Sequence, residues 1–348
     1  MAGSQIGIVV IGRNEGERLK VCLQSMRVPT IDAGQTAART RPVVYVDSGS
    51  SDGSVALARS MGAQIVELEM NRPFTAARAR NEGCARLRQI APDTQYVQFV
   101  DGDCAMAEGW LELAEVFLNE HPQCAAVAGR LRERHPERST YNRLCDIEWN
   151  TQPGEIGACG GIAMYRIGAL KQVNGFKSDM IAGEEPELCF RLREAGWHIY
   201  RHEAEMALHD AAMTRLAQWW KRATRAGYAY ALGASLHSDS PERYRVKETL
   251  SIWLWGLVVP VLGVVLAVPT QGISLILLCG YPMLACRVYR YMRGRDFPAR
   301  EAGLYACFCV LAKFPQLQGQ LRFWLGWLRS KPSGLIEYKA VQTAGGKL

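Results

Sequence analysis

The chain has 348 residues, of which 48% are hydrophobic and 22% charged, and its formal net charge is +7. This length allows two domains, or one large domain with an appendage. The charge is uneven, because basic residues outnumber acidic ones 18 to 6 in residues 211–348, whereas acidic residues lead 28 to 23 in residues 1–210. Since apolar runs accompany the basic part, we expect an anionic membrane surface as its partner and no nucleic acid.

Eleven cysteines are scattered along the chain without a Cys-x-x-Cys pair. This spacing fits reduced thiols in a cytosolic compartment better than a disulfide framework or a zinc site.

Strand-like and helical patterns alternate through the first 210 residues. Short runs rich in β-branched and aromatic residues predict strands over 6–11, 42–47, 63–68 and 96–100. Helical spacing lies between them, over 14–26, 52–62 and 74–89. This alternation indicates an α/β fold with a mostly parallel sheet and helices on both faces. Ligands of such sheets bind at the carboxyl ends of the strands.

Polar side chains follow several of these predicted strands and should share one rim of the sheet. They are Asn14, Asp47, Asp101 and Asp103. Asp101 and Asp103 flank Gly102 after an apolar strand, where carboxylates are costly unless a positive partner meets them. Mn²⁺ or Mg²⁺ takes oxygen ligands and could hold a diphosphate there. A single Asp-x-Asp pair is also common in solvated loops, so this interpretation depends on its neighbours.

Two further features lie near this rim. Asp47 precedes a Ser/Gly turn, and its carboxylate could either accept hydrogen bonds from a base or ribose or cap its own loop. Asp52 is predicted to cap the following helix. Arg80, on the helix over 74–89, could pair with Asp47 or with a phosphate.

The chain beyond residue 212 has a different character. A basic helical stretch over 213–249 precedes two apolar runs, 250–268 and 272–286. The first run has no charge across 19 residues, which is near the minimum for a bilayer span, and the second is marginal. Basic residues follow the second run, so the positive-inside rule places both outer ends of this hairpin in the cytoplasm. The alternative is that both runs are buried helices of a soluble domain.

A third apolar stretch, 303–329, is interrupted by Lys313 and Pro315 and resembles an interfacial amphipathic segment. We therefore expect four parts: a catalytic domain, a basic helical region, membrane-associated helices that include a hairpin over 250–286, and a tail. Their ranges are 1–212, 213–249, 250–330 and 331–348.

Six segments occur in a fixed order over residues 8–197. They read VVIGRNEGERL, VVYVDSGSSDGS, AARARNEG, FVDGDCAMAEGWL, ACGGIAMYRIGALKQVNGF and GEEPELCFRLREAGW. This ordered combination resembles the inverting family 2 glycosyltransferases, whose GT-A fold is a Rossmann-like mixed sheet that binds nucleotide sugars. The resemblance implies a nucleoside diphosphate sugar donor, with a UDP-sugar expected. It also implies a divalent cation, Mn²⁺ or Mg²⁺, and a single displacement at the anomeric carbon.

The resemblance also assigns roles to residues around the donor. The donor nucleotide would be held by Asn14, Glu15, Asp47, Arg80 and Asp101. Asp103 would be the direct metal ligand of the Asp-x-Asp pair, with Asp101 beside it. His209 stands where many relatives have a histidine that completes the metal shell, although a structural histidine is an equal alternative.

The remaining roles concern the donor sugar, the acceptor and the base. Gly160 and Gly161 would permit close approach of the sugar or acceptor. The family's general base belongs to a Glu-Asp pair, which here is Glu184-Glu185; we place the base at Glu185, with Glu184 as its rival. Two tryptophans, Trp219 and Trp220, could form a stacking platform for a sugar or could pack at the membrane interface.

The expected function is that of a metal-dependent, inverting glycosyltransferase of the hexosyltransferase type. It would sit on the cytoplasmic membrane with its catalytic domain facing the cytoplasm. Its acceptor would be membrane-held and lipid-linked, in surface polysaccharide or glycolipid biosynthesis. The alternatives are transfer to a polyprenyl monophosphate, a processive synthase, a sugar nucleotidyltransferase and a non-catalytic membrane scaffold.

Overall fold

The computed structural model describes residues 5–26, 41–69 and 71–329, and the expected tail over 331–348 lies outside them. The described chain groups into two compact units. The first contains the described residues up to 136 together with 148–212, and the second contains 137–147 and the described residues from 213 onward.

The first unit is built on one nine-stranded sheet, with the strand order β3-β2-β1-β4-β8-β6-β9-β5 and with β7 paired to β9. The strands are β1 (Ile6–Gly12), β2 (Val43–Asp47), β3 (Gln64–Glu67), β4 (Tyr96–Asp101), β5 (Cys104–Met106), β6 (Cys124–Glu133), β7 (Gly154–Glu155), β8 (Ala163–Arg166) and β9 (His198–His209). Strands β3, β2, β1 and β4 are mutually parallel. Strand β8 is antiparallel to both β4 and β6, while β9 is parallel to β6 and antiparallel to β5. The predicted α/β fold and the mixed sheet implied by the family resemblance are thereby confirmed. The expectation of a mostly parallel sheet is wrong, because four strand pairs are parallel and four are antiparallel.

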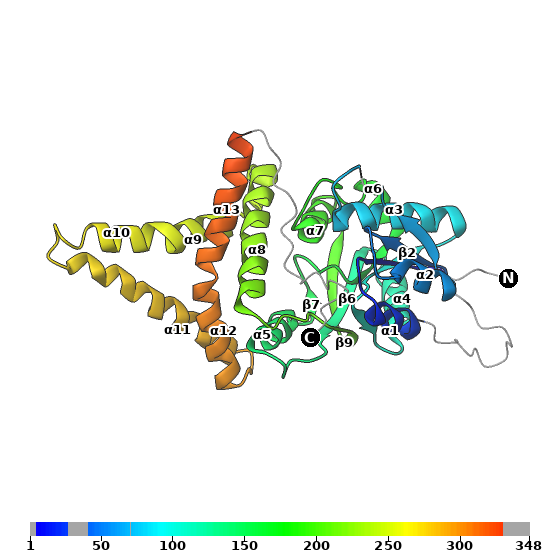
Figure 1. Ribbon diagram of the computed structural model, residues 1–348, viewed down its shortest axis with the longest axis horizontal. Coiled ribbons are helices and arrows are strands. Elements are labelled where there is room, and N and C mark those ends of the chain that lie inside the picture. Colours follow the sequence, from blue (N-terminus) through cyan, green and yellow to red (C-terminus); the bar gives the residue numbers. More distant parts are fainter. Residues whose placement is uncertain (1–4, 27–40, 70, 330–348) are drawn as a thin grey trace. The chain divides into compact units, whose positions relative to one another are not determined.

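Helices cover both faces of this sheet, with α3 and α7 on one side and α1 and α4 on the other (Figure 1). The helices of this unit are α1 (Glu17–Ser25), α2 (Ser54–Ser60), α3 (Ala76–Ile90), α4 (Trp110–Glu120), α6 (Ile167–Gln172) and α7 (Glu184–Glu194). Helix α1 begins later than predicted because Asn14 and Gly16 have positive φ angles of 54° and 50°. Asp52 is not the helix cap, since Gly53 occupies that position in α2.

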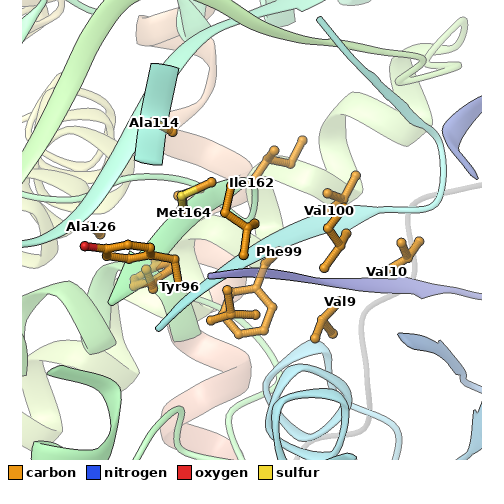
Figure 2. Packing of buried hydrophobic residues seen from close by; sticks show 14 of the residues in the cluster. Val9, Val10, Tyr96, Phe99, Val100, Ala114, Ala126, Ile162 and Met164 are labelled. Carbon is orange, nitrogen blue, oxygen red and sulfur yellow. The ribbon is translucent and has the colours of Figure 1, made fainter. Parts of the chain in front are cut away.

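The buried core lies where the first strands meet. Val9 and Val10 of β1 face Phe99 and Val100 of β4 in register, and all four side chains are buried. Figure 2 shows Val10 and Val100 on one side of the two strands and Val9 and Phe99 on the other. Each such side chain stabilises the fold by about 1.5–3 kcal/mol on burial. This packing fixes the end of β4 and therefore the position of Asp101, which directly follows Val100.

The second unit is helical. It contains α8 (Leu216–His237), α9 (Val246–Trp253), a π-helical segment (Leu254–Val258), α10 (Val259–Val265), a 3₁₀ segment (Ile273–Cys279), α11 (Gly280–Arg293), α12 (Ala299–Leu311) and α13 (Lys313–Leu328). Most of α5 (Thr140–Trp149) belongs to it as well. The predicted interruption of the third apolar stretch falls at Ala312, between α12 and α13, with Pro315 in the first turn of α13 where proline is tolerated.

Helices α8 and α13 run side by side (Figure 1). A glycine on each helix faces the backbone of the other. A Cβ atom on Gly227 would overlap the carbonyl oxygen of Gln316, and one on Gly319 would overlap that of Thr224. The two backbones approach closely because neither glycine carries a side chain at the crossing.

Two helical segments of this unit are long and apolar enough to cross a membrane. They are Val246–Val265, with 20 residues, and Ile273–Arg293, with 21 residues, and their most apolar 18-residue windows have mean hydropathies of 1.8 and 1.3. Only 17% and 6% of their apolar windows are buried within the described chain, so they are not core helices of this unit. These two segments weakly suggest membrane association.

Candidate active site

Arg80 is the centre of a buried ion cluster at the rim of the sheet. Its side chain is 2% exposed, and its guanidinium lies 3.2 Å from Asp101, 3.2 Å from Glu184 and 2.9 Å from Glu185. Helix α3 carries Arg80, the end of β4 carries Asp101, and the first turn of α7 carries both glutamates. The structure thus brings together three predicted site segments that lie far apart in the sequence.

The charges in this cluster support one another. Burial disfavours the guanidinium charge, but Glu185, Asp101 and Glu184 together outweigh that cost and raise the pKa of Arg80 above its ordinary value. Both glutamates also gain from the partial positive charge at the start of α7. The guanidinium carbon lies 5.6 Å from the centre of the Phe176 ring, which adds a cation–π contact.

The glutamate pair is unequal in its access to solvent. The Glu184 side chain is 3% exposed, whereas that of Glu185 is 17% exposed. A general base must reach a substrate hydroxyl, so this difference favours Glu185 over Glu184 for that role.

The two predicted glycines differ in the space around them. A Cβ atom on Gly161 would overlap a terminal nitrogen of Arg80 and lie 2.9 Å from a carboxylate oxygen of Glu185. A Cβ atom on Gly160 would have no neighbour within 4 Å. A side chain at position 161 would therefore displace the Arg80 guanidinium, whereas Gly160 borders open space.

Asp103 and His209 form a second polar contact beside this cluster. Asp103 is fully buried, and its Oδ2 lies 3.1 Å from Nε2 of His209, at the end of β9. Trp149 stacks on the His209 ring at 4.8 Å and fixes its plane, a contact that no sequence pattern indicated. A carboxylate oxygen and an imidazole nitrogen this close form a donor set that suits a divalent transition metal such as Mn²⁺. Asp101 is 32% exposed at the same rim and remains accessible to a ligand.

Glu133 is a buried residue that sequence reasoning missed. It is the last residue of β6 and pairs in register with His209. Its carboxylate accepts hydrogen bonds from the backbone amides of His135 and Ala211, both at 3.0 Å. Burial raises the pKa of Glu133 despite these two bonds. Glu133 therefore holds the backbone just after His209 in place. In the sequence RLRERH it resembles a solvent-exposed charge.

The loops after β1 and β2 are tied together. Asp47 accepts hydrogen bonds from the hydroxyl groups of Tyr45 and Ser50 and from the amides of Gly49 and Ser50. The side-chain oxygen of Asn14 accepts one from the backbone amide of Ser51 at 2.8 Å, and the backbone N–H of Asn14 donates to the hydroxyl of Ser50. Asp47 thus shapes its own loop, which was one of its two predicted roles.

The remaining nucleotide-site residues have partners of their own. Glu15 forms an ion pair with Arg18 at 2.8 Å. The predicted pairing of Arg80 with Asp47 is wrong, because the guanidinium is directed to Asp101 and the glutamate pair instead.

The two tryptophans belong to the helical unit. Trp219 is buried and meets the ring of Phe308 edge-on at 4.9 Å. Trp220 donates its indole N–H to Gln318 of α13 at 2.9 Å. Both rings therefore make contacts within their own unit.

Comparison with known proteins finds similarity to glycosyltransferases. Residues 7–173 match the family described as "Glycosyl transferase family 2". A "Pre-mycofactocin glycosyltransferase" of Mycobacterium tuberculosis is 31% identical over 218 residues, which cover 59% of this chain and 44% of that protein. The "Glycosyltransferase AglE" of Haloferax volcanii is 24% identical over 215 residues, covering 59% of this chain and 67% of that protein. The match therefore spans less than half of the mycobacterial relative.

Two solved structures share the fold. One is the mannosyltransferase PcManGT of Pyrobaculum calidifontis in complex with GDP-Man and Mn²⁺, with a TM-score of 0.55 and 17% identity, over 92% of this chain and 88% of that one. The other is residues 1–349 of TarS from S. aureus, with a TM-score of 0.51 and 15% identity, over 92% and 91% of the two chains. Residues 7–173 therefore belong to glycosyltransferase family 2, and the chain has a GT-A fold.

Proposed function

We propose that this protein is a metal-dependent, inverting glycosyltransferase that moves a hexose from a nucleoside diphosphate sugar to a membrane-held acceptor. The observation that carries the proposal is the Arg80 cluster, in which one buried guanidinium joins Asp101 of the Asp-x-Asp pair to the acidic pair at the start of α7. Donor-binding and base-bearing segments are thereby held next to each other, as a direct displacement requires.

The donor is proposed to be a nucleoside diphosphate sugar. Family membership supports this class, and PcManGT, which shares the fold, was solved with GDP-Man and Mn²⁺. We retain a UDP-sugar as the expected donor and a GDP-sugar as the first alternative. Asn14, Glu15 and Asp47 are proposed to border the nucleotide at the ends of β1 and β2.

The metal, Mn²⁺ or Mg²⁺, is proposed to bind at Asp103 and His209, with the partly exposed Asp101 beside them. When bound, it would neutralise the charge that develops on the leaving diphosphate, so that no protein acid is needed. The Asp103–His209 pair offers one oxygen and one nitrogen, a combination that favours Mn²⁺ over Mg²⁺.

Glu185 is proposed as the general base. Its carboxylate takes the proton of an acceptor hydroxyl while that oxygen attacks the anomeric carbon, and the bond to the nucleoside diphosphate breaks in the same step. One displacement inverts the configuration at that carbon. Arg80 orients the carboxylate through its 2.9 Å contact.

The acceptor is proposed to be lipid-linked, on the cytoplasmic face of the membrane, in surface polysaccharide or glycolipid biosynthesis. The support is the pair of apolar helices, Val246–Val265 and Ile273–Arg293, whose side chains are mostly not buried in the described chain. In this arrangement residues 1–212 are the catalytic domain, and the helices from 250 to 330 hold it at the bilayer. A polyprenyl monophosphate is the alternative acceptor.

The donor site is tested by thermal stability of the full chain in detergent. UDP-, GDP- and dTDP-linked sugars are screened with Mn²⁺ and with EDTA, on the wild type and on Asp103→Ala. Asp52→Ala is the matched control, because Asp52 is exposed and accepts its hydrogen bonds from Ser54, two residues further along the same turn.

A rise of a few degrees with one donor, lost with EDTA and in Asp103→Ala but kept in Asp52→Ala, supports the proposal. Stabilisation by a nucleoside triphosphate alone would replace it with a nucleotidyltransferase. No response to any nucleotide would contradict both and favour a scaffold.

A further inference from the structure

Cys104 lies next to the proposed metal ligands. It follows Asp103 directly, opens β5, and is fully buried. In the antiparallel pairing of β5 with β9, Cys104 stands directly opposite His209. Residues opposite each other in such a pair project their side chains to the same face of the sheet. The fold thus places a thiol on the side where the imidazole lies.

The three donor atoms are close enough to share one ion. Oδ2 of Asp103 is 3.1 Å from Nε2 of His209, and Sγ of Cys104 is 3.6 Å from Oδ1 of Asp103. One donor atom from each residue falls within 4.8 Å of the others. Around a four-coordinate ion, metal–ligand distances of about 2.0–2.3 Å place neighbouring ligands roughly 3.3–3.8 Å apart. The group needs only a small contraction to reach that geometry.

A thiol changes which ions a site prefers. Carboxylate and water oxygens suit Mg²⁺ and Mn²⁺, whereas a thiolate selects softer ions such as Zn²⁺. The proposed function needs only the oxygen and nitrogen ligands, so sulfur at this position adds a property that the transfer reaction does not require.

We infer that Cys104 is a third protein ligand of the metal site, which therefore binds Zn²⁺ and Co²⁺ through a carboxylate oxygen, an imidazole nitrogen and a thiolate sulfur. The thiol releases its proton to solvent when the metal binds. The inference rests on the proposed function only in placing a metal at Asp103 and His209. Zn²⁺ is then held more tightly than Mn²⁺, and it competes with Mn²⁺ for the site that the transfer reaction uses.

The test uses the metal alone, with the full chain in detergent, stripped of metal and kept with a phosphine reductant. Co²⁺ is titrated into the wild type, Cys104→Ser and Cys124→Ser. Cys124 is the matched control, because it is also buried in the same sheet and donates its thiol to the carbonyl of Ala126. Sulfur-to-cobalt charge-transfer absorption in the near ultraviolet reports a thiolate ligand, and visible d–d bands report cobalt binding as such.

The expected result is a charge-transfer band in the wild type and in Cys124→Ser that is lost in Cys104→Ser, while the d–d bands persist there. Zn²⁺ affinity, measured by competition with a chromogenic chelator, should fall at least about tenfold in Cys104→Ser. Mn²⁺ affinity, measured by electron paramagnetic resonance, should change far less. Cys104→Ala, with an unfolding temperature close to that of the wild type, guards against a serine-specific folding defect.

Two different failures can be told apart. A charge-transfer band that persists in Cys104→Ser, or an unchanged Zn²⁺ affinity, overturns the thiolate ligand and leaves the Asp103–His209 site intact. If neither Co²⁺ nor Mn²⁺ binds the wild type more tightly than Asp103→Ala, with and without GDP or UDP, the metal site fails, and the proposed function fails with it.

Discussion

Arg80 lies 2.9 Å from a carboxylate oxygen of Glu185, so the residue expected to support the nucleotide is bonded to the proposed base. The same guanidinium reaches Asp101 at 3.2 Å. A substitution of Arg80 should therefore affect both donor binding and the proposed base. Substitutions of the neighbouring residues should separate these two effects.

Arg80→Met should lower the stability of the catalytic domain. It removes the cation and leaves Glu184, 3% exposed, as a buried carboxylate without that partner. Breaking such a pair typically costs about 3–5 kcal/mol. Thermal unfolding should report a fall of several degrees or more, and Arg80→Lys a smaller one, because lysine keeps the charge but not the planar fork. Equal unfolding temperatures for all three proteins would contradict this.

Gly161→Ala should disrupt the ion cluster, because its Cβ atom would overlap Arg80 and crowd Glu185. The expected result is a loss of transfer activity together with a lower unfolding temperature, since Arg80 is buried and has little room to move. Gly160→Ala is the control, because its Cβ atom would meet no neighbour within 4 Å. Similar behaviour of the two variants in transfer and unfolding assays would refute the role given to Gly161.

The two glutamates should separate base function from stability. Glu185→Gln removes the proposed base, and the rate of the chemical step should fall by about 10²–10⁴-fold. Glu184→Gln should act mainly on stability, because Glu184 is nearly inaccessible and pairs with Arg80. Single-turnover transfer with the donor found in the thermal screen measures the first effect, and thermal unfolding measures the second. A larger rate loss in Glu184→Gln would move the base to that residue.

Cys124 should contribute a pH dependence to stability. Burial raises the pKa of its thiol from 9.0 to about 11, although a backbone hydrogen bond opposes the shift. Between these values the folded protein keeps a proton that the unfolded chain releases, so the free energy of unfolding falls as the pH rises from about 9 to about 11. Cys124→Ala should flatten that slope in thermal unfolding followed across this pH range. A slope identical to that of the wild type would show that another group causes it.

The sequence predicted the first four strands to within about a residue at each end, because their β-branched runs stand between clear turn residues. It did not predict β5 or β7, which have three and two residues and are too short to carry a periodic pattern. Strands β6, β8 and β9 were not predicted either. The order of the strands in the sheet depends on packing between distant segments, which a local pattern does not indicate. Helix starts shifted where Asn14 and Gly16 adopt positive φ angles.

The candidate site was predictable in its members more than in its contacts. The strand ends predicted one rim for Asn14, Asp47, Asp101 and Asp103. The partners of Arg80 depend on how distant segments pack together, and no local pattern indicates them. Glu133 could not be recognised, because a charged residue between arginines reads as exposed. Cys104 could not be recognised either, because its proposed role depends on its position opposite His209 in β5, a strand that no pattern predicted.

The glycine contacts between α8 and α13 also have a consequence for how the chain is made. Gly227 and Gly319 lie about ninety residues apart, so a ribosome adding about 5–20 residues per second makes them roughly 5–20 s apart. The two apolar helical segments, Val246–Val265 and Ile273–Arg293, are synthesised within that interval. The face of α8 that receives α13 is thus still uncovered when these segments leave the ribosome. Both segments are therefore made before α13 can pack against α8 and complete the helical unit.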